Sequence, residues 1–328
     1  MKRIIITIIF VLSLKLAFGQ DSQFSQFYAT PLYLAPSFAG ATDGDRLAVS
    51  YRNQWPSIPN SFQTFTFSYD HYYPKLKSGL GVLILRDQAG SGYLATTNFG
   101  IVYSYNIKFR NKWSFRPGIN FMYTQRDIDY SKLEFIDDIY DPDSPGSQVD
   151  QRLEVDRKAD IDASVSGLAY NKNYWIGFTM DHLLKPNRSL TGDVSQDPFK
   201  YTLFGGAKFS IFEKYNLLSG QSISPAFLFK YQEKYTQLDL GLYWYQMPLV
   251  IGVWYRGIPV FKNMPSSDAL VFLIGMKLDQ ISIGYSYDLT ISQLVGHTGG
   301  AHEISINYTF NQGVTQRMKR KGLPCPTF

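Results

Sequence analysis

The sequence predicts an all-β protein, a transmembrane antiparallel β-barrel of the outer membrane with about 14 strands. Three observations indicate this class. The chain begins with an export signal, Phe, Tyr and Trp make up 16% of its residues, and apolar and polar residues alternate along most of its length. In a membrane barrel every second residue of a strand faces lipid and the others face a polar lumen, so alternation and aromatic richness are expected together.

Residues 1–19 are predicted to be a secretory signal peptide. Lys2 and Arg3 precede an apolar run over 4–18 that one lysine interrupts, and small residues before Gln20 suit a signal peptidase. The run is shorter than the ~20 apolar residues of a spanning helix. Without this leader, 29 basic residues face 27 acidic ones and the net charge falls from +5 to +2, which argues against a nucleic-acid partner. Export and the barrel pattern together predict the outer membrane of a Gram-negative bacterium.

The strands are identified one by one from the alternation. The segment 64–70 is typical, because its aromatic residues fall on one face and Thr64, Thr66, Ser68 and Asp70 fall on the other. Most such segments have about the ~9–11 residues that a tilted strand needs to cross a bilayer. Fourteen segments share the pattern: 45–53, 61–72, 78–87, 93–107, 112–126, 159–170, 173–183, 199–211, 221–232, 235–246, 248–256, 268–278, 281–290 and 301–310.

The connections within the predicted barrel, 45–310, alternate between short and long, as expected when turns lie in the periplasm and loops lie outside. The long outer loops are near 127–158 and 184–198. Two junctions break the alternation, since 212–220 is long for a turn and 232–235 is short for a loop, so twelve or sixteen strands remain open alternatives. A soluble β-sandwich also alternates faces, but an open sheet of this size would leave edges to protect, whereas a barrel has none.

Both ends of the mature chain fall outside the predicted wall. Residues 20–44 are expected to form an N-terminal periplasmic arm and 311–328 a C-terminal periplasmic tail, which meet periplasmic partners or plug the lumen. The closing strand is expected to end at Phe310, because two prolines flanking Cys325 lack the backbone N–H that a paired strand requires. As the single cysteine of the chain, Cys325 forms no internal disulfide and is a buried small hydrophobe, an unpaired thiol or a partner contact.

No catalytic or metal site stands out in the sequence. The histidines are scattered, and no nucleophile motif accompanies them; they are His71, His182, His297 and His302. The aspartates of the longest loop lack the glycine and closing glutamate of an EF-hand and predict a solvated loop; they are Asp137, Asp138, Asp141, Asp143 and Asp150. The sequence therefore predicts a protein that is not an enzyme and that uses no cofactor and no metal.

Three stretches of the sequence resemble the PorP/SprF family of outer-membrane proteins. They are the mature start QFSQFYATPLYLAPSFAG, the stretch YRNQWPSIPNSFQTFTFSYD and the ending LPCPTF. The likeness spans the whole mature chain, including GLGVLILRDQAGSG (79–92) and YWIGFTMDHLLKPN (174–187). The candidate partner contacts within the second and third stretches are Asn53, Gln54, Trp55, Pro56, Cys325 and Phe328.

The resemblance implies a role in the type IX secretion and gliding system, whose members of this family are barrels needed for export or surface attachment of particular large proteins. The implied partners are a secreted cargo or adhesin with a type IX sorting domain, other secretion-system components or a peptidoglycan-linked periplasmic protein, and the lipid bilayer. The residues alone leave a diffusion porin or small-solute transporter as the alternative, in which the polar inner rows would line a wet channel. A surface enzyme is the third hypothesis and lacks a recognisable site.

Overall fold

The computed structural model describes residues 21–42, 44–90, 94–109, 112–129, 157–190, 194–211, 221–233, 235–258, 269–291, 296, 298–310 and 324–325. The predicted signal peptide, the aspartates singled out in the 127–158 loop, His297 and Phe328 lie outside the described residues.

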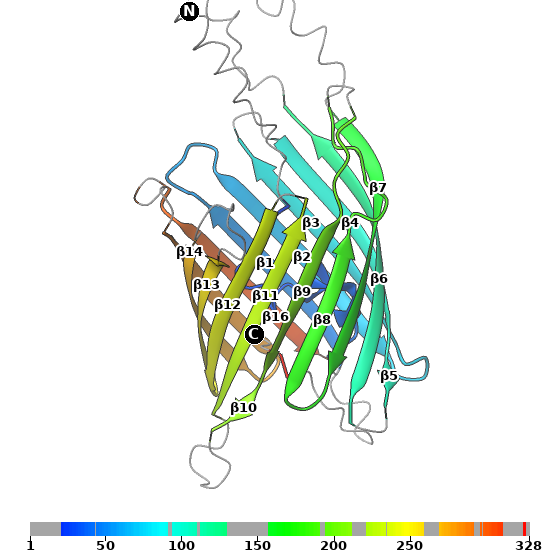
Figure 1. Ribbon diagram of the computed structural model, residues 1–328, viewed down its shortest axis with the longest axis vertical. Helices are drawn as coiled ribbons and strands as arrows, with labels where there is room; N and C mark the ends of the chain where they lie inside the picture. The colour runs from blue at the N-terminus through cyan, green and yellow to red at the C-terminus, as the bar shows by residue number, and fades with distance from the viewer. Residues whose placement is uncertain are drawn as a thin grey trace, which may run out of the picture.

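Antiparallel strands form a closed barrel whose strands are tilted relative to the barrel axis (Figure 1). The wall closes where β1 pairs with β16 in a continuous register from Asp45 opposite Phe310 to Gln54 opposite Ala301. Closure removes the two sheet edges, which no water could satisfy inside a bilayer. The fourteen long strands are β1 (Asp45–Gln54), β2 (Phe62–Tyr73), β3 (Ser78–Ala89), β4 (Leu94–Tyr105), β6 (Ser114–Asp127), β7 (Arg157–Tyr170), β8 (Tyr174–Asp181), β9 (Lys200–Ala207), β11 (Ser222–Gln232), β12 (Tyr235–Gln246), β13 (Leu249–Ile258), β14 (Ala269–Leu278), β15 (Ile281–Thr290) and β16 (Ala301–Phe310).

The predicted count of fourteen is confirmed, because each predicted segment corresponds to one long strand. Two further strands of two residues each, β5 (Ile107–Lys108) and β10 (Phe209–Ser210), only extend neighbouring pairings at one end of the wall. The junctions that broke the alternation do not hide a strand, since β9 pairs directly with β11 from Gly206 opposite Ala226 to Lys200 opposite Gln232. The two junctions therefore depart from the alternation of short and long connections without changing the number of long strands.

The two faces of the wall follow the alternation in the sequence. On β2, Phe65 is exposed while Thr64 and Thr66 are buried, and on β15 Ile283 is exposed while Ser286 is fully buried. Outward apolar side chains recur on strand after strand, as a lipid-facing surface requires. We call the end with the short connections, where β1 begins and β16 ends, the turn end, and the opposite end the loop end.

The N-terminal residues 21–42, here called the plug, lie inside the barrel and not beside it (Figure 1). Two short helical segments, α2 (Pro31–Leu34) and η1 (Pro36–Phe38), each begin with a proline, whose fixed φ suits the first helical position. Of the described helices, none is long and apolar enough to cross a membrane. The segment expected as a periplasmic arm, 20–44, thus has its described part in the lumen, where polar strand faces offer it hydrogen-bond partners.

The plug is fixed to the wall at several heights. Near the turn end the Gly40 N–H donates to Asp70 Oδ2 at 2.7 Å, and in the middle the Ser37 N–H donates to Ser166 Oγ at 2.7 Å. The fully buried Arg116 donates to the carbonyl oxygens of Ser37 and Ala39. Buried carbonyl and N–H groups need such partners, because an unpaired one costs about 1–3 kcal/mol.

Glycines in the wall make room for the plug backbone. A Cβ atom on Gly79 would overlap the carbonyl of Ala39, and one on Gly118 would overlap the backbone of Ser37. Both contacts are with main-chain atoms, which cannot rotate away as a side chain would. The polar inner face therefore receives a fitted segment of the same chain, and the plug and wall share one buried apolar cluster that includes Phe38, Leu83, Val102 and Phe204.

The C-terminal tail also reaches the lumen. Pro324 and Cys325 are buried, and Cys325 belongs to the apolar cluster that contains Tyr28 and Tyr243. The closing strand pairs with β1 up to Phe310, which lies opposite Asp45. Of the three interpretations of Cys325, the structure supports the small buried hydrophobe.

Burial should make the Cys325 thiol inert in the folded protein. Burial raises its pKa to about 12, so the reactive thiolate at pH 8 is roughly a thousandfold scarcer than for an exposed thiol with a pKa of about 8.5. A maleimide–polyethylene glycol reagent should label Cys325 only after heating in detergent. A Ser57→Cys, Cys325→Ser protein, with its cysteine on an exposed loop, should label at once, and rapid labelling of the native chain would contradict the placement.

Candidate functional site: the loop-end cavity

The candidate contacts singled out in the sequence lie on the rim of the barrel at the loop end. Asn53 and Gln54 end β1, with Asn53 on the outer face, where Ser61 Oγ donates to its side-chain oxygen at 2.9 Å. Gln54 and Trp55 line a cavity inside the rim, whereas Pro56 borders a separate hollow in the connecting loop. The four consecutive residues 53–56 thus face three different surfaces: the outer face of the wall, the cavity and the hollow in the loop. Cys325 is not among them, because it is buried in the lumen.

Trp55 has a strained backbone conformation. Its φ of 61° lies in the left-handed region, which is unusual for a bulky residue. Two backbone hydrogen bonds hold it, one from its own N–H to the Gly300 oxygen at 2.8 Å and one from the Ile58 N–H to its carbonyl at 2.9 Å. The indole packs edge-on against Phe62 with ring centroids 5.5 Å apart. Strain of this kind persists where the surroundings enforce it and is common at functional sites.

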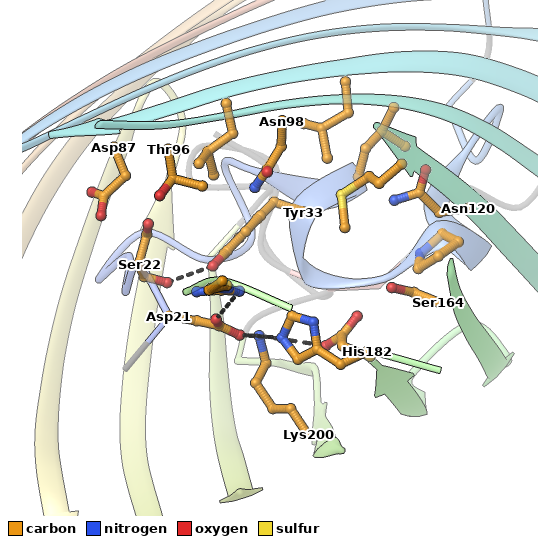
Figure 2. A pocket seen from close by; sticks show the side chains of 17 residues that line it. Asp21, Ser22, Tyr33, Asp87, Thr96, Asn98, Asn120, Ser164, His182 and Lys200 are labelled. Atoms are coloured by element: carbon orange, nitrogen blue, oxygen red, sulfur yellow. Dashed lines mark hydrogen bonds and ion pairs between the residues drawn. The ribbon is translucent and has the colours of Figure 1, made fainter. Parts of the chain in front are cut away.

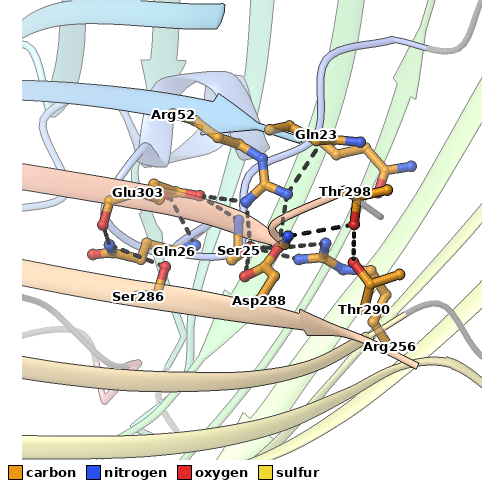
Figure 3. A network of polar contacts seen from close by, with 12 residues as sticks. Gln23, Ser25, Gln26, Arg52, Arg256, Ser286, Asp288, Thr290, Thr298 and Glu303 are labelled. Atoms are coloured by element: carbon orange, nitrogen blue, oxygen red, sulfur yellow. Dashed lines mark hydrogen bonds and ion pairs between the residues drawn. The ribbon is translucent and has the colours of Figure 1, made fainter. Parts of the chain in front are cut away.

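Four charged side chains from four strands bind the plug below this rim (Figure 3). This four-charge cluster consists of Arg52 on β1, Arg256 on β13, Asp288 on β15 and Glu303 on β16, all buried. Asp288 accepts from Arg52 at 2.7 Å and from Arg256 at 2.9 Å. The cluster is neutral overall, as a buried set of charges must be if it is not to cost several kcal/mol.

The plug completes the four-charge cluster with its own polar groups. The Ser25 and Gln26 N–H groups donate to the two oxygens of Glu303 at 2.7 and 3.0 Å. Ser25 Oγ donates to Asp288 and accepts from both arginines at 2.6 Å. Removing any one of these charged side chains would therefore remove hydrogen bonds to the plug and leave the cluster with a net charge.

A second charged cluster holds the beginning of the plug (Figure 2). The Asp21 carboxylate accepts from His182 Nε2 at 2.8 Å, from Arg188 at 3.0 Å and from Lys200 Nζ at 2.8 Å. His182 Nδ1 contacts Asp162 at 2.7 Å, so both ring nitrogens face carboxylates. Because these partners lie on β7, at the ends of β8 and β9 and in the loop between them, the plug begins at the loop end of the lumen and ends at the turn end.

The electrostatics of the second cluster favour the charged forms of Asp21 and His182. Burial alone would raise the pKa of Asp21, but the positive charges of Lys200, His182 and Arg188 hold it well below the usual value. Burial alone would lower the pKa of His182, but the negative charge of Asp21 and the hydrogen bonds to Asp162 and Asp21 raise it to about 10. His182 is therefore an imidazolium at neutral pH and donates from both nitrogens.

The raised pKa of His182 gives a testable pH dependence. A folded-state pKa near 10 against an unfolded value of 6.5 means that the stabilisation is complete below 6.5 and is lost as the pH rises through 10. A folded barrel migrates faster than the unfolded chain in a denaturing gel, so heating before the gel reports its unfolding temperature. Near neutral pH the wild type should unfold at a higher temperature than His182→Gln, and the difference between the two unfolding temperatures should shrink toward about pH 10. Arg188 and Lys200 are common to both proteins, so their titration cancels to first order. A difference that grows with pH would contradict the assignment.

Above the plug the lumen keeps a cavity of about 670 Å³, within the ~300–1,000 Å³ of ordinary ligand sites. The first residues of the plug form its floor, the ends of the wall strands form its sides, and Trp55 and Phe62 lie on its rim. Both charged clusters contribute side chains to it. The described residues hold no group of His, Cys, Asp and Glu arranged as metal ligands. The charged, polar and aromatic side chains of the lining can bind a ligand by charge, hydrogen bond and aromatic contact.

Comparison with known families and structures adds the context. A family model described as type IX secretion system membrane protein PorP/SprF matches residues 16–308. The chain belongs to the PorP/SprF family. With its closed barrel, this PorP/SprF protein is an outer-membrane protein of the type IX secretion system. No curated protein matches the sequence.

Solved barrels resemble this PorP/SprF chain only distantly. The outer membrane protein Omp33 of Acinetobacter baumannii is 7% identical with a TM-score of 0.48, and the match covers 83% of this chain and 100% of Omp33. BamA from Haemophilus ducreyi lacking POTRA domains 1–3 is 10% identical with a TM-score of 0.42 over 82% of this chain and 71% of that one. A mutant of the Rh. blastica porin is 6% identical with a TM-score of 0.35 over 81% and 99%. These likenesses are too weak to carry an argument about function.

Sequence reasoning missed the residues of the two charged clusters that hold the plug. Asp288 and Glu303 fall on the polar faces of their strands, which predicted a lumen position but no partner. Asp21 and Ser25 lie in a segment without periodicity, so nothing local announced their role. Of the four described candidate contacts near Trp55, two line the cavity and two lie beside it. Charged residues at inward-facing strand positions were the signal that could have predicted these clusters, because a buried charge needs an oppositely charged partner within the lumen.

Proposed function

We propose that this PorP/SprF protein is a non-enzymatic, plugged barrel that supports secretion or surface attachment of a specific large cargo protein, such as an adhesin, at the loop end. The observation that carries this proposal is the plug, which covers the polar rows of the wall and leaves the cavity above it. In outer-membrane barrels the long loops face the outside, so a cavity at the loop end is placed to meet a protein at the cell surface. The plug runs down the lumen and ends near the turn end, where periplasmic or secretion-system partners would be met.

The alternative is a diffusion porin or small-solute transporter, which the polar inner faces favour. Thr64, Thr66, Ser68 and Asp70 do face the lumen, but all four are buried, with Asp70 paired to Arg46 and to the plug. A water-filled channel requires such residues to be wet. The plugged arrangement therefore supports the cargo role over the porin.

Two measurements test the proposal. Deleting the gene should remove one specific cargo from the cell surface while other surface proteins remain, as measured by surface proteomics, and complementation should restore it. The purified barrel in a planar bilayer should show little steady conductance. Unchanged surface cargo in the deletion strain would refute the cargo role, and steady high conductance would favour the porin.

A further inference from the structure

One sector of the turn end carries only positive charge. It consists of three connections: 73–78 from the end of β2 to the start of β3, 105–114 from β4 to β6, and 170–174 from β7 to β8. We call this surface the basic sector. The structure describes its five lysines, and all five are exposed. In sequence the three connections hold no acidic residue and six basic ones: Lys75, Lys77, Lys108, Arg110, Lys112 and Lys172.

The three connections form one continuous surface at the end of the barrel where β5 lies (Figure 1). The Asn106 N–H donates to the Lys77 oxygen at 2.8 Å, which joins the first connection to the second. Lys108 lies opposite Ser114, and Ser114 lies opposite Tyr170, which brings the second connection beside the third. The positive charges therefore add up over a single stretch of the rim.

The described carboxylates on the outer side of the turn end do not neutralise the basic sector. Asp45, at the start of β1, contacts the His71 ring. Asp279 lies between β14 and β15, several strands away in the sheet. At the loop end, by contrast, the outward Arg86 lies 3.9 Å from Asp127. Because like charges gathered without a nearby carboxylate repel one another, the basic sector gains from an anionic ligand.

Two of these lysines lie where another residue would suit the backbone better. Lys77 has a φ of 52° and Lys112 a φ of 66°, in the left-handed region that Gly and Asn adopt more readily. A lysine is thus present at two turn positions despite local strain. Strain of this kind points to a role for the side chain.

Exposed aromatic side chains place the basic sector at the membrane interface. Outward rings lie beside every one of its connections, and they are Tyr73, Tyr105, Trp113 and Tyr174. In membrane proteins such rings gather where the hydrocarbon core meets the lipid headgroups. Lysines just beyond that level reach lipid phosphates with their flexible stems. Since the rings belong to the lipid-facing wall, an anion that meets both rings and lysines is a lipid headgroup and not an acidic protein.

We propose that the basic sector binds anionic phospholipids of the periplasmic leaflet, with its lysines contacting the lipid phosphates. The short turns of outer-membrane barrels face the periplasm, which gives the leaflet. Phosphatidylglycerol has a net negative charge, whereas the choline cation of phosphatidylcholine offsets its phosphate. The basic sector therefore favours phosphatidylglycerol. This inference goes beyond the proposed function and does not depend on the cargo.

The test compares the two lipids at the full-length barrel in phosphatidylcholine vesicles. Spin-labelled phosphatidylglycerol and spin-labelled phosphatidylcholine with the same acyl chains are added in separate samples. Electron paramagnetic resonance then measures the fraction of each lipid whose motion the protein restricts. Phosphatidylglycerol should be preferred about fivefold, as expected for one lysine at an anionic membrane surface. The preference should fall in 1 M salt, where the screening length is about 3 Å.

A Lys75→Gln, Lys108→Gln, Lys172→Gln variant removes one charge from each connection of the basic sector. Its preference for phosphatidylglycerol should fall to less than half of the wild-type value, because each lysine acts on lipid at its own part of the rim. All three side chains are exposed, so the folded gel band should remain.

The matched control variant is Arg86→Gln, Arg157→Gln, Lys185→Gln. It removes the same number of exposed positive charges at the loop end, where Arg157 lies opposite Asp127 and Arg86 lies near the same carboxylate. This variant should keep the wild-type preference. Equal association of the two lipids with the wild type, or equal losses in the two triple variants, would overturn the inference.

Fluorescent polyglutamate distinguishes a lipid site from a docking surface for an acidic protein. It is added to the barrel in nonionic detergent micelles, and anisotropy reports binding. If polyglutamate binds the wild type but not the Lys75→Gln, Lys108→Gln, Lys172→Gln variant, while the two lipids associate equally, the ligand is an acidic protein and the lipid inference is wrong. A lipid preference that this variant loses and the loop-end control keeps supports the inference.

Discussion

A Gly118→Leu variant is expected to conduct ions across a planar bilayer where the native barrel is nearly silent. Gly118 faces the lumen on β6, and any side chain there would occupy the space of the Ser37 backbone in the plug. Overpacking against a backbone that can yield costs about 1–3 kcal/mol, and here the main chain of η1 cannot yield without leaving the wall. The barrel is wide enough to leave an aqueous path once the plug moves, as large barrels do.

The control for this variant lies next to it. Gly167, on β7, faces Pro117 across the same strand pair and points outward, where an added Cβ would meet only the edge of the Phe115 ring. Gly167→Leu changes volume by the same amount on the lipid side and should stay silent. Equal conductance in both variants would mean that the barrel had been disturbed in general. Silence in both would mean that the plug does not close the lumen where the structure places it.

A Glu303→Ala variant should lose about 3–5 kcal/mol of stability, the cost typical of removing one partner from a buried set of charges. Glu303 is fully buried, pairs with Arg52 at 3.2 Å and accepts the Ser25 and Gln26 N–H groups of the plug. Its removal leaves two buried donors and part of the Arg52 charge without an acceptor. The temperature at which the folded gel band disappears should fall markedly, and protease should cut the plug between 21 and 30.

Two controls define this result. Glu303→Gln keeps the shape and two acceptor lone pairs, so it should lose less stability than Glu303→Ala. The exposed pair of Arg86 and Asp127, 3.9 Å apart with the Arg86 side chain half exposed, should be worth at most about 1 kcal/mol. If Asp127→Ala costs as much as Glu303→Ala, the four-charge cluster does not have the role assigned to it.

Most of the wall could be predicted from the sequence because the information is local. In β2, β15 and β16 the alternation places each side chain on the correct face, and the long outward rows of Phe, Tyr and Ile admit one interpretation in a membrane. Alternation up to Phe310 predicted the closing strand, whose described pairing with β1 runs to that residue. Even the two irregular junctions, near 212–220 and 232–235, did not change the count, because strand length and periodicity carried it.

The candidate site was less predictable because its residues are distant in the sequence. The NQWP motif was recognised by resemblance, yet only two of its residues line the cavity, and its left-handed Trp55 depends on a hydrogen bond to Gly300. The lumen position of Glu303 followed from alternation, but its bond to Ser25 joins residues 278 positions apart. No local pattern in 21–42 distinguishes a segment that fills a lumen from one that lies in the periplasm.

The sequence by itself predicted the class of protein, a wall of about 14 strands and the face on which the strand residues lie, because periodicity is a property of neighbouring residues. Tertiary structure alone decided what fills the barrel. Closure of β1 on β16 brings Arg52, Asp288 and Glu303 to one point of the wall. Ser25 of the plug hydrogen-bonds to the two carboxylates there. Nearer the turn end, glycines of the wall leave room for the plug backbone at Ser37 and Ala39. Charge neutralisation and close backbone packing are properties of that assembled interior, and they turned a predicted membrane barrel into a plugged one with a binding cavity at its loop end.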